Sequence, residues 1–309
     1  MNALTQIPLK FWLGEKVVFK KWLSLVVRDF SLQEIFTLPT VSGESSVLPP
    51  GGDGFFYRSM PDHLALDDLT QNGEMIPYIS ARYNRYYIDL SGDFQGYLDH
   101  FSSKSRATLR RKVRAFAEFS GGEMHWRIYQ KPEEMVEYLQ LARCVSQQTY
   151  QERLLHAGLP SSAAFQEEVI ALAHQGLIWG CLLFYHARPI AFLHLPIQEG
   201  VVMYHYLGYD PQFSRWSPGT VLQYLVLEPL FAQSSLRWFD FTQGEGAHKQ
   251  FFSTHHTPCV DLFVLRATLK HRMWVHLHWG LDRMVTQLVH LLERWGVKTR
   301  IKRLIRMHA

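Results

Sequence analysis

Apolar runs separated by short turns are clearest in the middle of the chain. Two runs, at 177–186 and 190–198, are joined by a three-residue turn at 187–189, and the turn Glu199-Gly200 leads into a third run at 201–207. Runs of this length with such short turns are typical of strands joined as hairpins. We therefore expect an antiparallel meander of three strands.

The flanking sequence adds helices and further strands to this meander. Periodic apolar positions and N-capping serines predict helices, and short β-branched or aromatic runs predict strands. Helices are expected at 94–101, 102–119, 132–153, 161–174 and 218–232, and strands at 86–90, 237–241 and 259–266. Together they predict an α+β fold, with a mixed, mostly antiparallel sheet flanked by helices.

The two ends of the chain are less regular than its middle. An apolar stretch near the N-terminus favours an amphipathic helix, and a Gly- and Pro-rich stretch at 42–54 favours a loop. From residue 268 the pattern is helical and basic. We therefore divide the chain into an N-terminal region, 1–85, a central domain, 86–266, and a basic helical extension, 267–309.

Composition and charge narrow the possible classes of protein. The net charge of the 309 residues is only +4, so binding of phosphate must come from local clusters of charge. The odd number of well-separated cysteines favours buried thiols in a reducing compartment over disulfides. These cysteines are Cys144, Cys181 and Cys259. Neither a secretory signal nor a membrane-spanning run is visible, which predicts a cytoplasmic protein, with peripheral contact at the inner membrane as an alternative.

The start of the helix at 218–232 has the chemistry of an anion site. Ser217 can cap this helix, Pro218 suits its first position, and Gly219, followed by Thr220, leaves backbone donors uncovered. Free N–H groups and the helix dipole at such an end favour a pyrophosphate. The alternative is a well-capped helix with no ligand.

The loop at 242–249 brings reactive side chains together between glycines. Glu245 or His248 could take a proton from an attacking amine or hydroxyl. Lys249 could stabilise the oxyanion of a tetrahedral intermediate or hold a phosphate. The alternative is a solvated turn with ordinary surface charges.

The helix predicted at 102–119 is strongly basic. Arg106, Arg110 and Arg114 form a stripe beside its apolar face. The stripe could bind an anionic acceptor, cofactor phosphates or nucleic acid, and the alternative is a solvated basic face. Tyr150 and Arg153, at the end of another predicted helix, are further candidates for an acceptor pocket.

The histidines of the C-terminal part and the apolar face of the basic extension are candidates for a metal site and a membrane contact. The histidines of the C-terminal part lack carboxylate or cysteine partners at ligand spacing, so no metal site is expected. These histidines are His255, His256, His271, His276 and His278. The basic extension has an apolar helical face, which can pack on the protein or lie on an anionic membrane.

Three segments together resemble the BioF2-like, or CelD-type, GNAT acetyltransferases. Residues 103–112 resemble the family's S-K-x-R-x-x-L-R-R-K segment, 209–220 resemble the segment before its cofactor-binding helix, and 239–249 resemble its F-D-F-x-x-G-x-x-x-(Y/H)-K motif. The resemblance extends over roughly 86–266. The usual GNAT phosphate loop, Q/R-x-x-G-x-G/A, is here reduced to Gly219.

The resemblance implies a GNAT fold, a CoA thioester donor and direct acyl transfer without a covalent enzyme intermediate. A strand tyrosine, Tyr206 or Tyr209, would be the general acid toward the leaving thiolate. Backbone donors of 206–208, together with Lys249, would aid attack on the thioester carbonyl. The residues in contact with acyl-CoA would be Leu207, Gly208, Arg215, Ser217, Gly219 and Thr220.

We therefore expect an acyltransferase that moves an acetyl or other acyl group from acyl-CoA to an amine or hydroxyl. The resemblance links it to exopolysaccharide or cell-envelope synthesis, with a saccharide or a lipid-linked intermediate as acceptor. The family is also similar to FemAB-type enzymes, which use aminoacyl-tRNA and carry a lysine that would correspond to Lys249; residues 1–85 would then be a degenerate GNAT half. The alternatives are such an aminoacyl-tRNA-dependent transferase and a non-catalytic scaffold that binds polymer or membrane.

Overall fold

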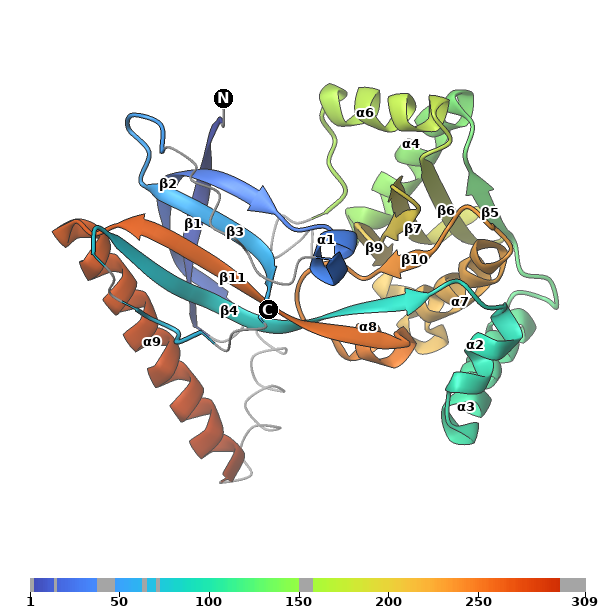
Figure 1. Cartoon of the computed structure of the whole chain (residues 1–309). Helices are drawn as coiled ribbons and strands as arrows, with labels where there is room; N and C mark the ends of the chain where they lie inside the picture. Colours follow the sequence, from blue (N-terminus) through green and yellow to red (C-terminus); the bar gives the residue numbers. More distant parts are fainter. Residues whose placement is uncertain are drawn as a thin grey trace. The chain divides into compact units, whose positions relative to one another are not determined.

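The computed structural model describes residues 3–13, 16–37, 48–62, 66–70, 73–149 and 158–294. The chain divides into two compact units, which are coloured along the sequence in Figure 1. The first unit comprises Met1–Tyr83 and Pro258–Ala309, and the second comprises Asn84–Thr257. The division into 1–85, 86–266 and 267–309 stays a prediction about folding domains.

The sheet of the first unit has the strand order β1-β2-β3-β11-β4. Its strands are β1 (Leu4–Leu13), β2 (Lys16–Asp29), β3 (Gly54–Pro61), β4 (Met75–Asp89) and β11 (His255–Arg266). β1 and β2 are antiparallel, β2 and β3 are parallel, and β3 and β11 are antiparallel. The unit boundaries fall inside β4 and β11, so each of these strands contributes residues to both units.

The amphipathic helix expected near the N-terminus is wrong, because this segment forms the β1–β2 hairpin. Leu9 and Phe11 of β1 and Leu23 and Leu25 of β2 are buried. Burial at every second position is the period of a strand and not of a helix. Adjacent lysines in β2 interrupt this alternation in the sequence and hide it.

Helix α9 (Leu269–Arg294) packs on the sheet of the first unit, which also contains the short helix α1 (Leu32–Thr37). Val275 of α9 lies in the same core as Leu9 and Leu25. Trp274 stacks on Phe19 of β2 with 5.4 Å between the ring centroids. The helical pattern expected after residue 268 is therefore confirmed as far as Arg294.

The second unit is a mixed sheet with helices on both faces. Its strand order is β4-β10-β8-β7-β6-β5, and β9 pairs with β7 outside this order. The β10–β8 pair is parallel, whereas β10–β4, β8–β7, β9–β7, β7–β6 and β6–β5 are antiparallel. The expected α+β architecture, with a mixed and mostly antiparallel sheet, is confirmed.

Most elements of the second unit lie close to their expected positions. The strand at Trp126–Tyr129 was not expected, and the helix expected at 132–153 is too long, because it ends at Ser146 and residues 147–149 form turns. The strands are β5 (Trp126–Tyr129), β6 (Ile178–Tyr185), β7 (Arg188–Gln198), β8 (Val201–Met203), β9 (Tyr206–Tyr209) and β10 (Trp238–Asp240). The helices are α2 (Phe94–His100), α3 (Ser103–Phe119), α4 (Met135–Ser146), α6 (Ala163–His174), α7 (Pro218–Phe231) and α8 (Ala247–Phe252), with 3₁₀ turns η1 (Pro132–Glu134) and η2 (Pro211–Trp216). Ser102 and Ser162 cap α3 and α6 through their side chains, as expected.

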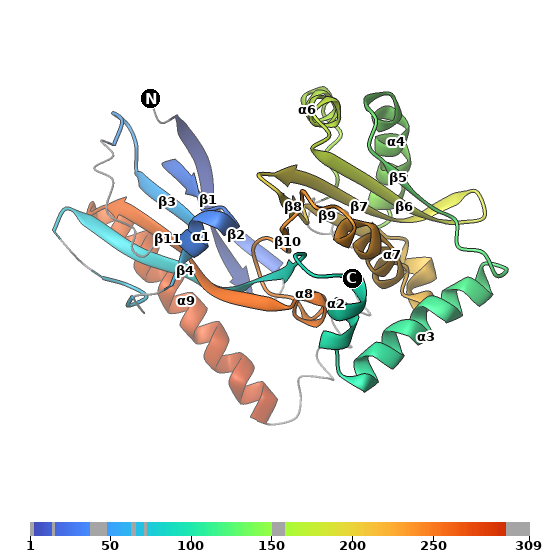
Figure 2. The same ribbon diagram turned by 45° about the vertical axis from the view of Figure 1, so that its right-hand side comes forward.

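Alternate residues of the central strands face two different cores, and Figure 2 shows α7 and α4 on opposite sides of these strands. Cys181 and Leu193 lie in the core that contains α3 and α7. Leu182 and Phe192 lie in the core that contains α4 and α6. A strand buried on both faces gives a continuous apolar run, which is why β6 and β7 were visible in the sequence.

Two further details differ from expectation. The third strand of the meander is not continuous at 201–207, because it breaks after Met203 into β8 and β9. Cys144 is exposed, whereas Cys181 and Cys259 are buried; all three are free thiols. The break in the third strand creates the site described next.

Candidate functional site

The third strand of the meander leaves β10 at the break between β8 and β9. Met203 of β8 is paired with Asp240 of β10, and the Tyr204 amide donates to the Asp240 carbonyl at 2.9 Å. Beyond this point the chain leaves β10 and pairs with β7, with Gly208 opposite Phe192. Two neighbouring strands that begin together and then diverge leave an open edge between them.

The hydrogen-bond phase of β9 decides which of its peptide groups face that edge. The Asp210 amide donates to the Ile190 carbonyl at 2.8 Å, which places Tyr206 and Gly208 at the positions bonded to β7. The N–H and C=O groups of Leu207 and Tyr209 therefore point away from β7. No strand in the described part of the chain pairs with that side of β9.

Gly208 allows β9 to pack tightly on its other face. A Cβ atom at this position would lie 2.3 Å from the ring of Phe192 and 2.8 Å from the methyl group of Thr149. Any larger residue would push β9 off β7 or displace the Phe192 ring. Of the two strand residues expected to contact a cofactor, Leu207 presents its backbone to the open edge and Gly208 holds the strand in place.

The N-terminus of α7 lies against β9. A Cβ atom at Gly219 would be 3.4 Å from the ring of Tyr209 and 3.7 Å from the side chain of Leu207. Ser217 is in the left-handed region (φ 52°, ψ 47°), and the capping bond expected from its side chain is absent. The amides of Gly219 and Thr220 therefore have no capping partner among the described residues, which leaves them available to an anion.

The turn before α7 is held by charge and by stacked rings. Asp210 is 1% exposed and accepts hydrogen bonds from the Gln212 amide and the Arg188 guanidinium. The Arg215 guanidinium lies 5.0 Å from the centroid of the Trp216 ring, and Trp216 stacks on Phe119 of α3 at 4.3 Å. Arg215 is thus anchored on an aromatic face close to the start of α7.

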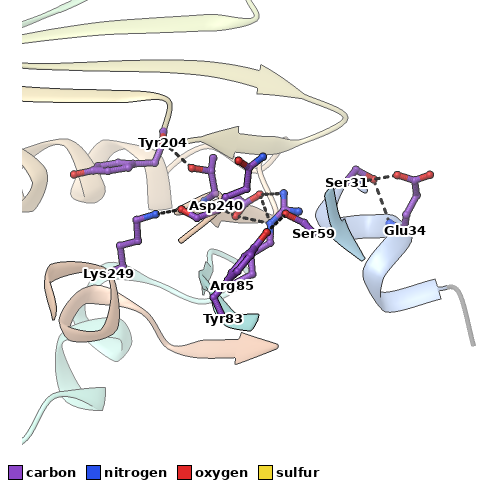
Figure 3. Close-up of polar contacts among 10 residues, drawn as sticks. Ser31, Glu34, Ser59, Tyr83, Arg85, Tyr204, Asp240 and Lys249 are labelled. Carbon is purple, nitrogen blue, oxygen red and sulfur yellow. Dashed lines mark hydrogen bonds and ion pairs between the residues drawn. The ribbon is translucent and has the colours of Figure 1, made fainter. Parts of the chain in front are cut away.

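A buried ion pair lies at the end of β10. Arg85 is 3% exposed and Asp240 is fully buried. The Arg85 Nε atom is 3.1 and 3.2 Å from the two Asp240 carboxylate oxygens, and the Thr242 amide donates to the same carboxylate at 2.8 Å (Figure 3). A buried charge pair is stable only when its hydrogen bonds are met, so Asp240 fixes both Arg85 and the start of the 242–249 loop.

Lys249 of α8 points back into this loop. Its Nζ atom donates to the Gln243 carbonyl and, at 3.2 Å, to the Gly244 carbonyl (Figure 3). Burial lowers the pKa of Lys249 to about 8; Asp240 opposes this shift and Arg85 adds to it. The loop is therefore internally bonded around a partly desolvated ammonium group.

His248 and Glu245, the two expected proton acceptors, differ in their surroundings. His248 is exposed, and its ring centroid lies 5.8 Å from that of Tyr204. Burial of part of the ring, and then Lys249, lower the pKa of His248, so the imidazole is a free base at neutral pH. Glu245 is exposed and accepts from the Asn84 amide at 3.3 Å.

Two residues at the strand break were not singled out as site residues from the sequence. Tyr204 is buried, and its hydroxyl has no hydrogen-bond partner among the described residues. His205 is exposed where β8 ends. Burial lowers the pKa of His205, while Asp240 and Glu168 raise it. The sequence placed both on the third strand, beside the expected acyl site, but gave them no role, because the break that exposes them has no clear mark in the sequence.

Tyr206, the expected general acid, contacts residues of α6 and β7. Its ring is half-buried and contacts Phe165 of α6 and His194 of β7, with centroid distances of 6.2 and 5.8 Å. Burial raises its pKa, and so does Glu168. The Tyr206 ring also lies 6.3 Å from the His205 ring, so its contacts reach both α6 and the strand break, whereas His248 contacts Tyr204. Its role, like that of Tyr209, which is 40% exposed, stays a prediction.

The expected acceptor residues are only partly described. Arg106 forms an ion pair with Asp99 of α2. Arg110 is exposed on α3; burial and Glu228 raise the pKa of Tyr224 in α7, and Arg110 opposes them. Tyr150 and Arg153 lie outside the described residues.

Among the described residues there is no group of three or more His, Cys, Asp or Glu side chains placed to hold a metal ion. Within the same residues, no helix is both long and apolar enough to cross a membrane.

Comparison with protein families identifies the class of fold. Residues 103–250, which are 148 of the 309 residues, match the family model described as "Acetyltransferase (GNAT) domain". This match and the mixed sheet with its diverging strands show a GNAT-like fold. The matched family is one of acetyltransferases, which supports an acyl-transfer reaction. A search of curated proteins gave no significant match.

The search of solved structures found similar chains at low sequence identity. The crystal structure of FemX has a TM-score of 0.50 and 9% identity, with 89% of this chain and 91% of that chain covered. L-PGS from Bacillus licheniformis has a TM-score of 0.45 and 15% identity, with 72% and 71% covered. The FemX likeness extends beyond residues 103–250 to most of both chains. The finer assignment to BioF2-like or CelD-type enzymes stays a prediction.

Proposed function

We propose that this protein transfers an acyl group from acyl-CoA to an amine or hydroxyl, at the edge where β9 leaves β10. The observation that carries the proposal is the pairing of an open strand edge with an uncapped helix start. The outward peptide groups of Leu207 and Tyr209 lie beside Gly219 at the N-terminus of α7. An extended amide chain that ends in a pyrophosphate has the chemistry to use both features at once.

Three parts of acyl-CoA, the pantetheine arm, the pyrophosphate and the thioester, would each have a place in this arrangement. The amide groups of the pantetheine arm would bond to the open edge of β9, in the manner of an added strand. The pyrophosphate would accept from the Gly219 and Thr220 amides, with Arg215 as a neighbouring cation. The thioester would then lie toward the strand break, near Tyr204 and His205.

The residues at the strand break can supply the proton transfers. The acceptor nitrogen or oxygen attacks the thioester carbonyl and gives its proton to a neutral imidazole, that of His248 or His205. Both rings are shifted toward the neutral form by burial. The C–S bond then breaks, and the CoA thiolate takes up the proton held by the imidazolium, so that the products are an amide or ester and free CoA, and the histidine is neutral again.

Charge that develops on the carbonyl oxygen needs stabilisation in a site partly closed to water. The Leu207 N–H, which points away from β7, can donate to this oxygen, and the Lys249 ammonium adds a positive charge near the same end of β10. The Arg85–Asp240 pair does not touch the reacting atoms in this scheme. It positions the loop that carries Lys249, because Asp240 bonds to both Arg85 and Thr242.

An aminoacyl-tRNA-dependent reaction of the FemAB type is the second candidate. It is favoured by the FemX likeness, which covers about nine-tenths of each chain, including the first unit that the family model does not match. In that case the open edge would receive an aminoacyl ester in place of a CoA thioester. For either donor, the acceptor class we propose is a saccharide or a lipid-linked intermediate of envelope or exopolysaccharide synthesis.

Calorimetric titration with acetyl-CoA tests the proposal. The wild type should bind, and Gly219→Glu should abolish binding, because it places a negative charge at the uncapped helix start. Gly92→Glu is the matched control: Gly92 is exposed, and a Cβ atom added there would have no other atom within 4 Å. Binding that is lost in Gly219→Glu and kept in Gly92→Glu supports the CoA site.

Other outcomes separate the alternatives. If the wild type does not bind acetyl-CoA but binds aminoacyl-tRNA, the FemAB-type reaction replaces the CoA reaction. If it binds neither donor, the non-catalytic scaffold is the better description. If Gly219→Glu binds as tightly as the wild type, the phosphates do not rest on α7.

A further inference from the structure

A stripe of exposed apolar side chains follows the outer side of α9. Its members are 45% to 57% exposed: Met273, Leu277, Met284, Leu288 and Leu291. Steps of four, seven, four and three residues keep them on one side of the helix. The other side of α9 is the buried one, where His271, Val275 and His278 face the sheet of the first unit. This helix is therefore apolar on both sides, although only one side has a partner in the described chain.

The described charges around this stripe are basic. Lys270 and Arg283 are exposed, Arg272 is partly exposed, and Arg283 covers the Trp279 ring at 4.5 Å from its centroid. Asp282 instead lies on the sheet side, within electrostatic reach of Tyr78 and His278. In the sequence from 267 to 309 there are nine Lys or Arg and two Asp or Glu, a net charge of +7 where the whole chain carries +4.

We propose that the outer side of α9 binds an anionic lipid surface, with the helix lying in the plane of the interface. The stripe would enter the boundary between headgroups and acyl chains, and Lys270, Arg272 and Arg283 would meet the lipid phosphates. An in-plane position follows from the burial pattern, since the opposite side of the helix is occupied by the sheet. The stripe from Met273 to Leu291 gives a contact about 27 Å long.

A second copy of the chain fits this surface less well. The heptad positions of a coiled-coil seam would be Leu277, Leu281, Met284, Leu288 and Leu291. Leu281 packs against the core of the first unit, so it is not free to be a knob for a second helix. Two such helices would also bring the basic borders of both copies together, and like charges at these flanking positions oppose pairing. An anionic lipid surface has the opposite charge and needs no matching knobs.

Co-sedimentation of the full chain with lipid vesicles tests this proposal. We expect binding to phosphatidylcholine vesicles that contain phosphatidylglycerol, weak binding to phosphatidylcholine alone, and release as salt is raised. Met273→Gln/Leu277→Gln removes apolar surface without changing charge, and it should lower the partition coefficient at least about tenfold. Arg272→Gln/Arg283→Gln should lower it about fivefold for each charge removed, at constant vesicle composition.

Thr286→Gln is the matched control, because Thr286 is exposed on α9 away from the stripe. It should bind like the wild type. All these positions are at the surface, and circular dichroism would show that the variants are folded. Acetyl-CoA titration should be the same for the stripe variant and the wild type, so failure of this proposal is distinct from failure of the proposed reaction.

Three results would overturn the proposal. The wild type could fail to bind the phosphatidylglycerol vesicles at low salt. The stripe variant could bind as well as the wild type, which would assign the contact to other basic segments. The wild type could also be a dimer that the stripe variant converts to a monomer, which would assign the stripe to a second copy.

Discussion

The ammonium group of Lys249 is only partly exposed to solvent. Burial lowers its pKa to about 8, and its donors are directed to the Gln243 and Gly244 carbonyls. A cation of this kind costs less to desolvate further when a substrate closes the site, and it acts more strongly on a developing negative charge. The residue-scale claim is that Lys249 works in its charged form.

This claim predicts the pH dependence of the transfer reaction. Because the folded pKa is about 8, the fraction of charged Lys249 falls as the pH rises through 8, and kcat/KM should fall with it. Lys249→Arg stays charged in this range, so its alkaline decline should disappear. Lys249→Met should lower kcat by roughly 10² to 10³ at pH 7. Release of the CoA thiol measures all three; an unchanged alkaline limb in Lys249→Arg would show that another group titrates.

The Arg85–Asp240 pair predicts a non-additive effect on stability. Arg85→Met or Asp240→Leu alone leaves one buried charge without its partner and should cost about 3–5 kcal/mol of the free energy of unfolding. The double variant removes both charges, so its cost should be well below the sum of the two single costs. Urea unfolding of the four proteins gives the coupling energy. Additive losses would mean that the two side chains do not stabilise each other.

Arg85 shows why site residues were only partly predictable. Glu245, His248 and Lys249 stand together in the sequence and were identified by their spacing, whereas Arg85 and Asp240 are 155 positions apart. Nothing local marks an arginine as buried, because its burial depends on a carboxylate from another strand. Tyr204 and His205 were given no role from the sequence for a similar reason: their place in the site follows from the strand break beside them.

At the scale of elements, the site depends on the short strand β9 and the start of α7. β9 pairs only with β7 among the described strands, over four residue pairs. Gly208 permits its close approach to Phe192, and Gly219 brings α7 against the other face of the strand. The apolar runs predicted β6, β7 and α7 well, because an element buried on both faces has a continuous run of apolar residues. The division of the third strand was not predictable, since both pieces are apolar and no Gly or Pro stands at the break.

The two glycines should respond differently to alanine. At Gly208 an added methyl group meets the Phe192 ring at 2.3 Å, so Gly208→Ala should lower the free energy of unfolding by about 1–3 kcal/mol and weaken acetyl-CoA binding. At Gly219 the nearest atom is 3.4 Å away, so Gly219→Ala should change stability by about 0.5 kcal/mol or less. Thermal unfolding compares them. Equal stability of the two variants would mean that β9 can move without cost.

At the scale of the whole molecule, distant parts of the sequence complete the same unit. β11 lies between β3 and β4 in the sheet of the first unit, and α9 packs on that sheet. The N-terminal 83 residues therefore depend on a segment that begins at Pro258. The sequence predicted β11 and α9 separately but assigned them to other regions, because pairing between strands about 200 positions apart leaves no local pattern.

This arrangement predicts the effect of truncation. A chain that ends at Thr257 lacks most of β11 and all of α9, so β3 and β4 lose the strand between them. The first unit should then unfold, and limited proteolysis should cut rapidly within residues 1–83. Slow cleavage in this region, at the rate of the full chain, would show that the unit folds without its C-terminal segment.

The central claim is that the open edge of β9 and the start of α7 form one binding site. Amide hydrogen exchange, resolved by residue and measured with and without acetyl-CoA, tests it most directly. We predict added protection at Leu207, Tyr209, Gly219 and Thr220, and little change at Tyr206 and Gly208, which already bond to β7. If acetyl-CoA binds and these four amides show no added protection, the thioester binds elsewhere and the proposed site is wrong.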